Sequence, residues 1–377
     1  TTAGNYVLRW TISNNPCTPS ISEVTITRNA LPTVANAGSP YASICVSNVT
    51  LNGNVVLVGE VGTWSVVSQP SGANVNFTNV NVNNSVANGL TLAGTYTLKW
   101  TISNGNCPVS ESTATITREP LPSVSIAGVN QNICLDQANL AANTPSVGVG
   151  LWTVVSQPVL ANTVFANANQ ASTIASGMTV AGSYVLRWTI SNASCPVSVS
   201  EVTITRDAAP SPAVAGLVAP ACNDIVTMNA TAVVVGIGTW SVVTAPSGST
   251  VAFVNVNNAV TQVNGLTVGG NYVFKWRVTN GSCPANEETV TVIRQTNPTV
   301  ANAGTNQSIC ADVATLSGNL PAVGIGVWTV VSSPVAVSFA NAAQNNTAVN
   351  GMTTAGNYVL RWTISNNPCT PSISEVT

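Results

Sequence analysis

The sequence predicts an all-β protein built from tandem β-sandwich domains, and three observations lead to that prediction. First, the chain is a repeat, because the tryptophans Trp64, Trp152, Trp240 and Trp328 advance by 88 positions at each step. Second, large apolar residues alternate with polar ones around a second tryptophan series, which is the period of a half-buried strand. Third, no segment has a 3.6-residue apolar period, and Gly, Pro and Asn clusters separate the short β-branched runs.

The repeat has four domains of about 88 residues. The second tryptophan series begins at Trp10 and advances by 90, 88, 88 and 86 positions, so the two series account for all nine tryptophans. Segment 1–25 returns unchanged at 353–377, an offset of 352 positions that equals those four steps together. We therefore expect the chain to be a window on a longer array. The expected divisions are 1–28 as the C-terminal hairpin of a preceding repeat, then repeats 29–118, 119–206, 207–294 and 295–377, the last with its final strand cut short.

The clearest predicted strand of each repeat holds the second tryptophan. In 96–102, large apolar residues occupy every other position. A polar turn with Asn and Gly follows, and 113–118 is a second alternating run, so the two runs predict a hairpin. Copies of the first strand are expected at 6–12, 184–190, 272–278 and 358–364. Shorter upstream strands are expected, in the second repeat, at 124–127, 138–141, 151–155 and 163–165.

A glycine stands two residues before the tyrosine that opens each of these strands, as in Gly94-Thr95-Tyr96. This spacing is similar to the tyrosine corner of Greek-key sandwiches, in which the phenol hydroxyl bonds to upstream backbone. The tyrosines and tryptophans are therefore expected to be core and not a ligand platform. The expected core residues are Trp64, Trp100, Trp152, Trp188, Trp240, Trp276, Trp328, Trp362, Tyr96, Tyr184, Tyr272 and Tyr358.

The last repeat shows a longer pattern that can be compared with known families. It contains ANAGTNQSIC at 301–310, then Leu316-Ser-Gly318, then Gly-Val-Trp328 and Gly356-Asn-Tyr358. This pattern resembles PKD-like and immunoglobulin-like repeats, which fill giant surface adhesins of gliding Bacteroidota, of the SprB type. The resemblance covers all four repeats and implies immunoglobulin-like (PKD-like) Greek-key domains. It also implies export by the type IX secretion route, a cell-surface filament, and adhesion coupled to gliding machinery.

The nine cysteines form two series with one member per feature. Every gap between them is at least 27 residues and the chain has no His, which disfavours zinc sites and a cysteine nucleophile. Regular placement in an exported chain favours a disulfide framework. One series precedes the second strand (Cys45, Cys134, Cys222, Cys310), and the other lies in the last hairpin turn (Cys17, Cys107, Cys195, Cys283, Cys369).

Fold geometry favours bridges between neighbouring repeats. In an immunoglobulin-like sandwich, the first interstrand loop and the last hairpin turn lie at opposite ends, roughly 25–35 Å apart for strands of this length. A disulfide needs Cα atoms within about 7 Å. In a head-to-tail array the opposite ends of neighbours meet, which favours Cys45–Cys195, Cys134–Cys283 and Cys222–Cys369, with Cys17, Cys107 and Cys310 paired outside the window. The alternatives are the intradomain pairs Cys45–Cys107, Cys134–Cys195, Cys222–Cys283 and Cys310–Cys369, or reduced buried cysteines.

The segments that join the repeats are short and contain proline, at 119–122, 207–212 and 295–298. Proline fixes φ and disfavours a helix before it, so these joints are expected to be stiff and extended. A rod-like array is the predicted outcome.

The composition excludes several function classes. The chain has 10 Lys and Arg, 12 Asp and Glu and no His, with a net charge of −2, which is no footprint for nucleic acid. No apolar run reaches the roughly 18–20 residues of a membrane helix. The missing His removes the commonest general base and metal ligand, and the four Asp form no calcium loop.

The few charges repeat in register, with Arg or Lys before the second tryptophan and Glu across the hairpin, which predicts exposed cross-strand ion pairs.

We therefore expect no enzyme and no cofactor. The predicted function is that of structural stalk repeats in a secreted, extracellular cell-surface adhesin filament, which transmits force and presents adhesive regions. The expected partners are neighbouring repeats of the same chain, with surface polysaccharide or substratum as candidates. The alternatives are a carbohydrate-binding repeat module and a subunit of an assembled extracellular fibre.

Overall fold

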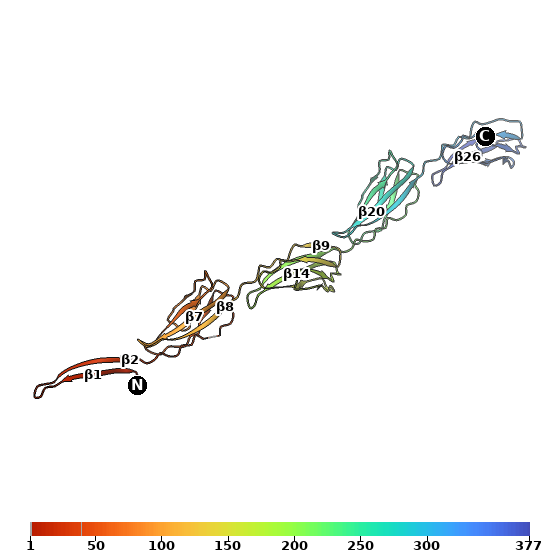
Figure 1. Ribbon diagram of the computed structural model, residues 1–377. Coiled ribbons are helices and arrows are strands. Elements are labelled where there is room, and N and C mark those ends of the chain that lie inside the picture. The colour runs from red at the N-terminus through yellow and green to blue at the C-terminus, as the bar shows by residue number, and fades with distance from the viewer. Residues whose placement is uncertain (1, 39) are drawn as a thin grey trace. The chain divides into compact units, whose positions relative to one another are not determined.

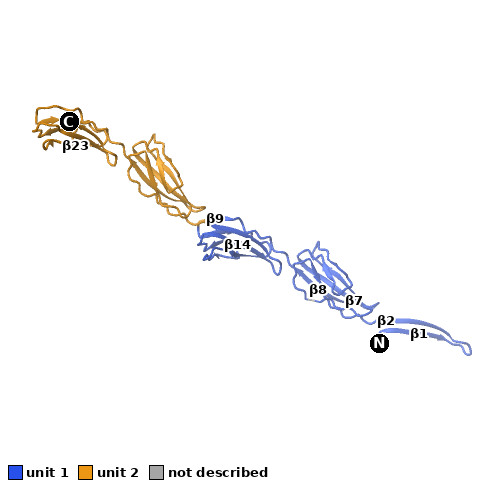
Figure 2. Ribbon diagram, turned by 180° about the vertical axis from the view of Figure 1, so that it is seen from behind, with its two compact units in different colours: residues 1–131, 135–206 blue, residues 132–134, 207–377 orange. Residues whose placement is uncertain are grey.

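The regular elements of the protein are all β-strands. The computed structural model describes residues 2–38 and 40–377, and no helix occurs among them. Consequently no helix in this part of the chain could cross a membrane. Two compact units make up the chain (Figure 2): unit 1 is Thr1–Gln131 with Leu135–Arg206, and unit 2 is Asn132–Cys134 with Asp207–Thr377.

Unit 1 begins with an antiparallel hairpin of β1 (Gly4–Ile12) and β2 (Ser20–Arg28). It is a two-stranded sheet of its own, and every residue of both strands is exposed. Trp10, the first member of the second tryptophan series, is 71% exposed.

Each of the four repeats has two sheets, and repeat 29–118 shows their order. One sheet has the order β3-β6-β5 and the other the order β4-β7-β8, in which β7 and β8 are the long antiparallel hairpin (Figure 1). These orders correspond to the B-E-D and C-F-G sheets of an immunoglobulin sandwich. The bounds are β3 (Asn48–Thr50), β4 (Val61–Ser68), β5 (Asn76–Phe77), β6 (Val86–Asn88), β7 (Gly94–Ser103) and β8 (Ser110–Arg118).

The other three repeats reproduce this pairing. In repeat 119–206 the sheets are β10-β13-β12 and β11-β14-β15-β9; in unit 2 they are β16-β19-β18 with β17-β20-β21, and β22-β25-β24 with β23-β26-β27. The chain is therefore a tandem series of immunoglobulin-like Greek-key β-sandwiches. The bounds are β9 (Gln131–Ile133), β10 (Gln137–Ala141), β11 (Val149–Ser156), β12 (Val164–Phe165), β13 (Ser172–Ser176), β14 (Gly182–Ser191), β15 (Ser198–Arg206), β16 (Ile225–Asn229), β17 (Ile237–Thr244), β18 (Ala252–Phe253), β19 (Val260–Asn264), β20 (Gly270–Thr279), β21 (Asn286–Arg294), β22 (Val313–Thr315), β23 (Ile325–Ser332), β24 (Ser338–Phe339), β25 (Ala348–Asn350), β26 (Val359–Ser365) and β27 (Ser372–Val376).

A pair of tryptophans lies at the centre of each repeat. Trp64 on β4 is directly opposite Trp100 on β7, and their ring centroids are 5.0 Å apart. Alternation along both strands turns the two rings inward together, and burial of such large apolar side chains is the main stabilising term of the sandwich. The eight core tryptophans are all at most 2% exposed: Trp64, Trp100, Trp152, Trp188, Trp240, Trp276, Trp328 and Trp362.

The tyrosine that opens each long strand closes a corner with the backbone four residues upstream. The hydroxyl of Tyr96 donates to the carbonyl of Leu92 at 2.7 Å and accepts from its N–H at 3.1 Å. Gly94 between them has a φ of +137°, and a Cβ there would lie 2.9 Å from Cγ of Pro70. The same pair of contacts is made by Tyr184 with Val180, Tyr272 with Val268 and Tyr358 with Thr354. Tyr96, Tyr184 and Tyr272 are fully buried, whereas Tyr358 is half-buried.

The prediction of a strand at 124–127 is wrong. The segment is extended, but side chains take the place of a backbone ladder: the N–H of Ser125 donates to Oγ of Ser198 at 2.9 Å, and Ser200 makes the equivalent contact two residues on. The amide side chain of Asn143 binds the opposite edge of the segment. Backbone groups must find partners, but alternation in a sequence does not reveal whether the partner is backbone or side chain.

We expect Gly150→Ala to lower the free energy of unfolding by about 1–3 kcal/mol, the usual cost of overpacking. A Cβ on Gly150 would lie 2.0 Å from Cζ2 of Trp188, which is fully buried and held by its neighbours. Urea unfolding of the full oxidised chain measures the effect. Leu151→Ala is the matched control, because Leu151 is on the opposite face of the strand and 44% exposed. Equal midpoints for the two variants would show that the indole can move aside freely.

Candidate structural site: the joints between repeats

Six of the nine cysteines are bonded in three long-range pairs. The structure brings together Cys45 and Cys195, Cys134 and Cys283, and Cys222 and Cys369, with Cα separations of 5.2, 4.8 and 5.3 Å. Among residues 2–38 and 40–377, Cys17, Cys107 and Cys310 are free, and none of the four intradomain pairs is formed. Each bonded pair therefore links the first cysteine of one repeat to the turn cysteine of the next.

The first cysteine of a repeat lies where the chain leaves that repeat. Ile44, just before Cys45, forms a parallel bridge with Arg118, the last residue of β8. Its N–H donates to the carbonyl of Thr117 at 2.9 Å, and its carbonyl accepts from the N–H of Glu119 at 2.8 Å. This isolated bridge places Ile44 beside the end of β8, so that Cys45 lies next to the start of the linker.

The turn cysteine of the following repeat approaches the same linker. Cys195 closes a turn with Asn192, whose carbonyl accepts the Cys195 N–H at 3.0 Å. The side-chain amide of Asn192 donates to the carbonyl of Pro120 at 2.7 Å, and Sγ of Cys195 lies 3.6 Å from the same oxygen. Residues 119–120 are therefore held on one side by Ile44 and on the other by Asn192, with the disulfide beside them.

The same arrangement recurs within unit 2. The N–H of Asp207 donates to the carbonyl of Ile133, and the N–H of Gln295 donates to that of Ala221, so each linker begins with the same contact. On the other side, the asparagine amide grips the linker carbonyl in each case: Asn280 binds Ala208 at 2.8 Å and Asn366 binds Thr296 at 2.7 Å.

Sequence reasoning missed these asparagines, although their signal was readable. An asparagine stands three residues before every turn cysteine, and each accepts the cysteine N–H in a turn. The fixed spacing indicates a structural turn, but it does not reveal that the amide reaches a linker some 72 positions away in the sequence. The asparagines are Asn14, Asn104, Asn192, Asn280 and Asn366.

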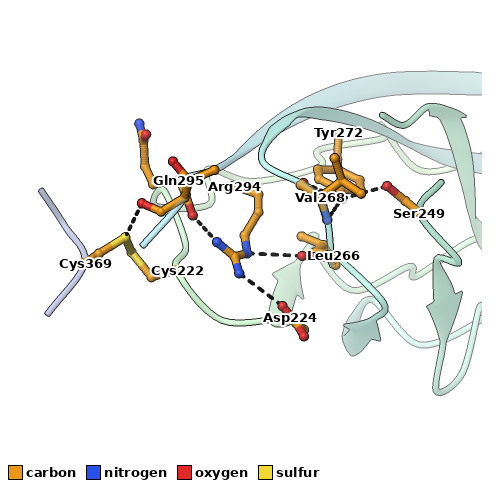
Figure 3. A network of polar contacts seen from close by, with 10 residues as sticks. Cys222, Asp224, Ser249, Leu266, Val268, Tyr272, Arg294, Gln295 and Cys369 are labelled. Carbon is orange, nitrogen blue, oxygen red and sulfur yellow. Dashed lines mark hydrogen bonds and ion pairs between the residues drawn. A yellow bond between two sulfur atoms is a disulfide. The ribbon is translucent and has the colours of Figure 1, made fainter. Parts of the chain in front are cut away.

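Arg294, the last residue of β21, binds both the segment before β20 and the loop that carries Cys222 (Figure 3). Arg294 donates to the carbonyl of Leu266 at 3.1 Å and to that of Gln295, and it pairs with Asp224 at 3.1 Å. The arginine side chain is only 10% exposed, whereas that of Asp224 is 56% exposed, so the guanidinium is buried and the carboxylate faces water. Asp224 follows Cys222 by two residues, so the network fixes the loop that carries the disulfide.

The predicted ion pairs across the hairpin are present. Arg187 on β14 is directly opposite Glu201 on β15, and their closest atoms are 2.6 Å apart. Where the cation is lysine, the carboxylate is offset: Lys99 pairs diagonally with Glu111 at 2.9 Å. These side chains are 30–45% exposed, so each pair contributes about 0.2–1 kcal/mol at most. They stabilise the strand register.

A carboxylate at the second joint is set to respond to pH. Oδ2 of Asp207 accepts from the N–H of Ser282 at 2.6 Å and from its hydroxyl at 2.8 Å. These bonds, of which the one from the N–H has the largest effect, hold the pKa of Asp207 below its ordinary value. Because folding lowers this pKa, the contact stabilises the joint above the unfolded-state pKa and is lost as the pH falls through the folded-state pKa.

We therefore expect the amide proton of Ser282 to shift between pH 6 and pH 2, with a midpoint below the ordinary pKa of an aspartate, about 3.9. An NMR titration of the full chain measures this midpoint. In Asp207→Asn the transition should vanish, because no carboxylate remains to titrate. A midpoint at or above the ordinary aspartate value would contradict the contact.

No site for a metal ion is formed by the residues that the structure describes: no group of three or more His, Cys, Asp or Glu side chains is placed to hold one. The joints contain disulfides, backbone carbonyls, asparagine amides and, at the second joint, Asp207.

Comparison with known proteins shows similarity in fold alone. No protein-family model matches the chain, and no match is found among curated proteins. A structure of titin domains I67–I69 is 14% identical, covers 68% of this chain and 94% of its own, with a TM-score of 0.40. The N-terminal eight immunoglobulin domains of Down syndrome cell adhesion molecule are 11% identical, over 98% of this chain and 52% of their own, with a TM-score of 0.40. The insect immune protein hemolin is 12% identical, over 92% of this chain and 99% of its own, with a TM-score of 0.29.

Proposed function

We propose that the chain is a structural stalk segment of a long extracellular adhesin, in which tandem repeats carry tension and hold an adhesive region away from its anchor. The observation that carries the proposal is the build of the joints. Residues 119–120 are held by backbone bonds from one repeat and by an asparagine amide from the next, beside a disulfide. A connection of this kind resists tension, whereas a ligand site would need an accessible cleft with converging polar groups.

The disulfides also support an extracellular location. Disulfides persist in oxidising compartments and are rare where glutathione and thioredoxin keep thiols reduced. In the setting that the sequence resemblance implies, the stalk is exported by the type IX route and acts in surface adhesion and gliding. Its partners are then the neighbouring repeats, the gliding machinery, and the polysaccharide or other substratum that the adhesive region contacts.

The outer surfaces suit a filament that does not aggregate with its copies. The strand that carries the first tryptophan of each repeat has its free edge partly covered, as on β4, where the N–H of Trp64 donates to the carbonyl of Val80 at 2.8 Å. A covered edge strand is a poor template for pairing with another chain.

Single-molecule pulling on the two ends of the full chain tests the proposal. In the oxidised chain we expect no repeat-sized lengthening steps, because the disulfides bypass the repeats. After reduction, each repeat of about 88 residues should release up to about 290–320 Å of contour on unfolding. Repeat-sized steps in the oxidised chain would contradict a tension-bearing stalk.

A binding assay provides the second test, since stalk repeats should be inert. The oxidised chain is passed over surfaces coated with bacterial and plant polysaccharides. We expect no retention above that of an unrelated immunoglobulin-like protein. Saturable retention that free polysaccharide abolishes would contradict the stalk function and would indicate a carbohydrate-binding module.

A further inference from the structure

The three disulfides close rings that overlap along the chain. The rings span 45–195, 134–283 and 222–369, so each shares part of its backbone with the next. The shared stretches are 134–195 and 222–283. Between Cys45 and Cys369, every peptide bond therefore belongs to at least one ring.

We infer that the overlapping rings give the protein two covalent tracks, so that tension and connectivity pass each joint twice. One track runs from Cys45 through the first disulfide to Cys195, along the backbone to Cys222, and through the third disulfide to Cys369. The other follows the backbone from Cys45 to Cys134, crosses the second disulfide to Cys283, and continues to Cys369. At each joint one track crosses by the linker peptide and the other by a disulfide.

The first consequence is tolerance of backbone cleavage. After any single cut between Cys45 and Cys369, the ring that contains the cut still joins its two sides. Two cuts also leave Cys45 joined to Cys369. If the backbone between Cys195 and Cys222 is cut, two stretches still lead from the first disulfide to the second and two lead from the second to the third, so one further cut cannot break the connection. At least three cuts are needed to separate these two residues.

The second consequence is a limit on length. Along the first track only 27 residue steps of backbone, from Cys195 to Cys222, lie between the two disulfides. Fully extended, that stretch spans about 90–97 Å, whereas the 324 steps from Cys45 to Cys369 along the backbone span about 1,070–1,170 Å. After complete loss of the fold, the span from Cys45 to Cys369 in the oxidised chain would thus reach only roughly a tenth of its length in the reduced chain.

The intradomain alternative makes the opposite prediction. Its rings 45–107, 134–195, 222–283 and 310–369 do not overlap, so each linker would be the sole connection between neighbours. The stretch between Cys195 and Cys222 discriminates the two schemes, because it lies inside the ring closed by Cys134 and Cys283 and outside every intradomain ring.

The experiment inserts a specific protease site into the full chain after Leu217, which is 98% exposed in that stretch. We expect the cleaved chain to migrate as one species without reductant and as two fragments with it. Two fragments without reductant would overturn the inference. Insertion after Val197, which is 54% exposed and lies in the same stretch, repeats the test if the first insertion impairs folding.

Two controls assign the result to the second disulfide. In Cys134→Ser with Cys283→Ser, cleavage after Leu217 should release two fragments even without reductant, because no ring then covers that stretch. A site after Val58, which is fully exposed, lies within the first ring and should leave one species in both backgrounds. The cleavage assay tests the covalent tracks whether or not the chain serves as a stalk, and its outcome is independent of the binding test above. The pulling test relies on the same three disulfides, so the binding test is the one that separates failure of the stalk from failure of the tracks.

Discussion

Cys134→Ser combined with Cys283→Ser is expected to lower the free energy of unfolding of the oxidised chain by about 3–5 kcal/mol. Loop-closure entropy gives about 5 kcal/mol for a ring of this length, in which the cysteines are 149 positions apart. The gain is reduced because the two neighbouring rings already restrict part of the same chain. Guanidinium unfolding measured by tryptophan fluorescence gives the difference.

Cys310→Ser is the matched control for this double variant. Cys310 is exposed and free in the structure, so its replacement should change stability by no more than about 0.5 kcal/mol. If the double variant unfolds at the same denaturant concentration as this control, the disulfide does not stabilise the fold. The linker contacts would then be the main connection at that joint.

Trp188→Ala is expected to cost about 3–5 kcal/mol, the usual range for removal of a large buried aromatic side chain. Trp188 is fully buried, is packed against Trp152 with ring centroids 5.2 Å apart, and donates from Nε1 to the carbonyl of Asn143. Truncation leaves a cavity between the two sheets and an unpaired carbonyl. Urea unfolding of the full chain measures the loss.

The control for this variant is Trp10→Ala in the same chain. Trp10 and Trp188 are embedded in the same eight residues, YVLRWTIS, but Trp10 is 71% exposed. Its replacement should change stability by no more than about 0.5 kcal/mol. A similar loss in both variants would mean that the strand sequence itself, and not burial between sheets, sets the contribution of the tryptophan.

The long hairpins could be predicted from the sequence because their signal is local. In 96–102, alternation alone decides which side chains point inward, and β7 extends this segment by only two residues at its start and one at its end. The tyrosine corner is equally local, since its contact spans four residues. The exposed pair of Arg187 and Glu201 follows from the same register.

The joints show where local signals end. The spacing of the cysteines left the interdomain and intradomain pairings both open, and only a fold-level distance argument favoured one of them. The grip of Asn192 on Pro120 and the bonds of Asp207 to Ser282 join residues 72 and 75 positions apart. Segment 124–127 was misassigned for a related reason, because its partners are serine side chains on a strand more than seventy positions away.

Taken by itself, the sequence determined the period of the repeats, the all-β class, the inward face of each long strand and the turn that carries each second cysteine. These properties depend on backbone geometry over a few residues. The tertiary structure alone decided which of the three identical YVLRWTIS segments have a buried tryptophan, and which cysteine lies within bonding distance of which. Burial requires a second sheet opposite the strand, and a disulfide requires two distant segments to meet, so neither is a property of the local residues.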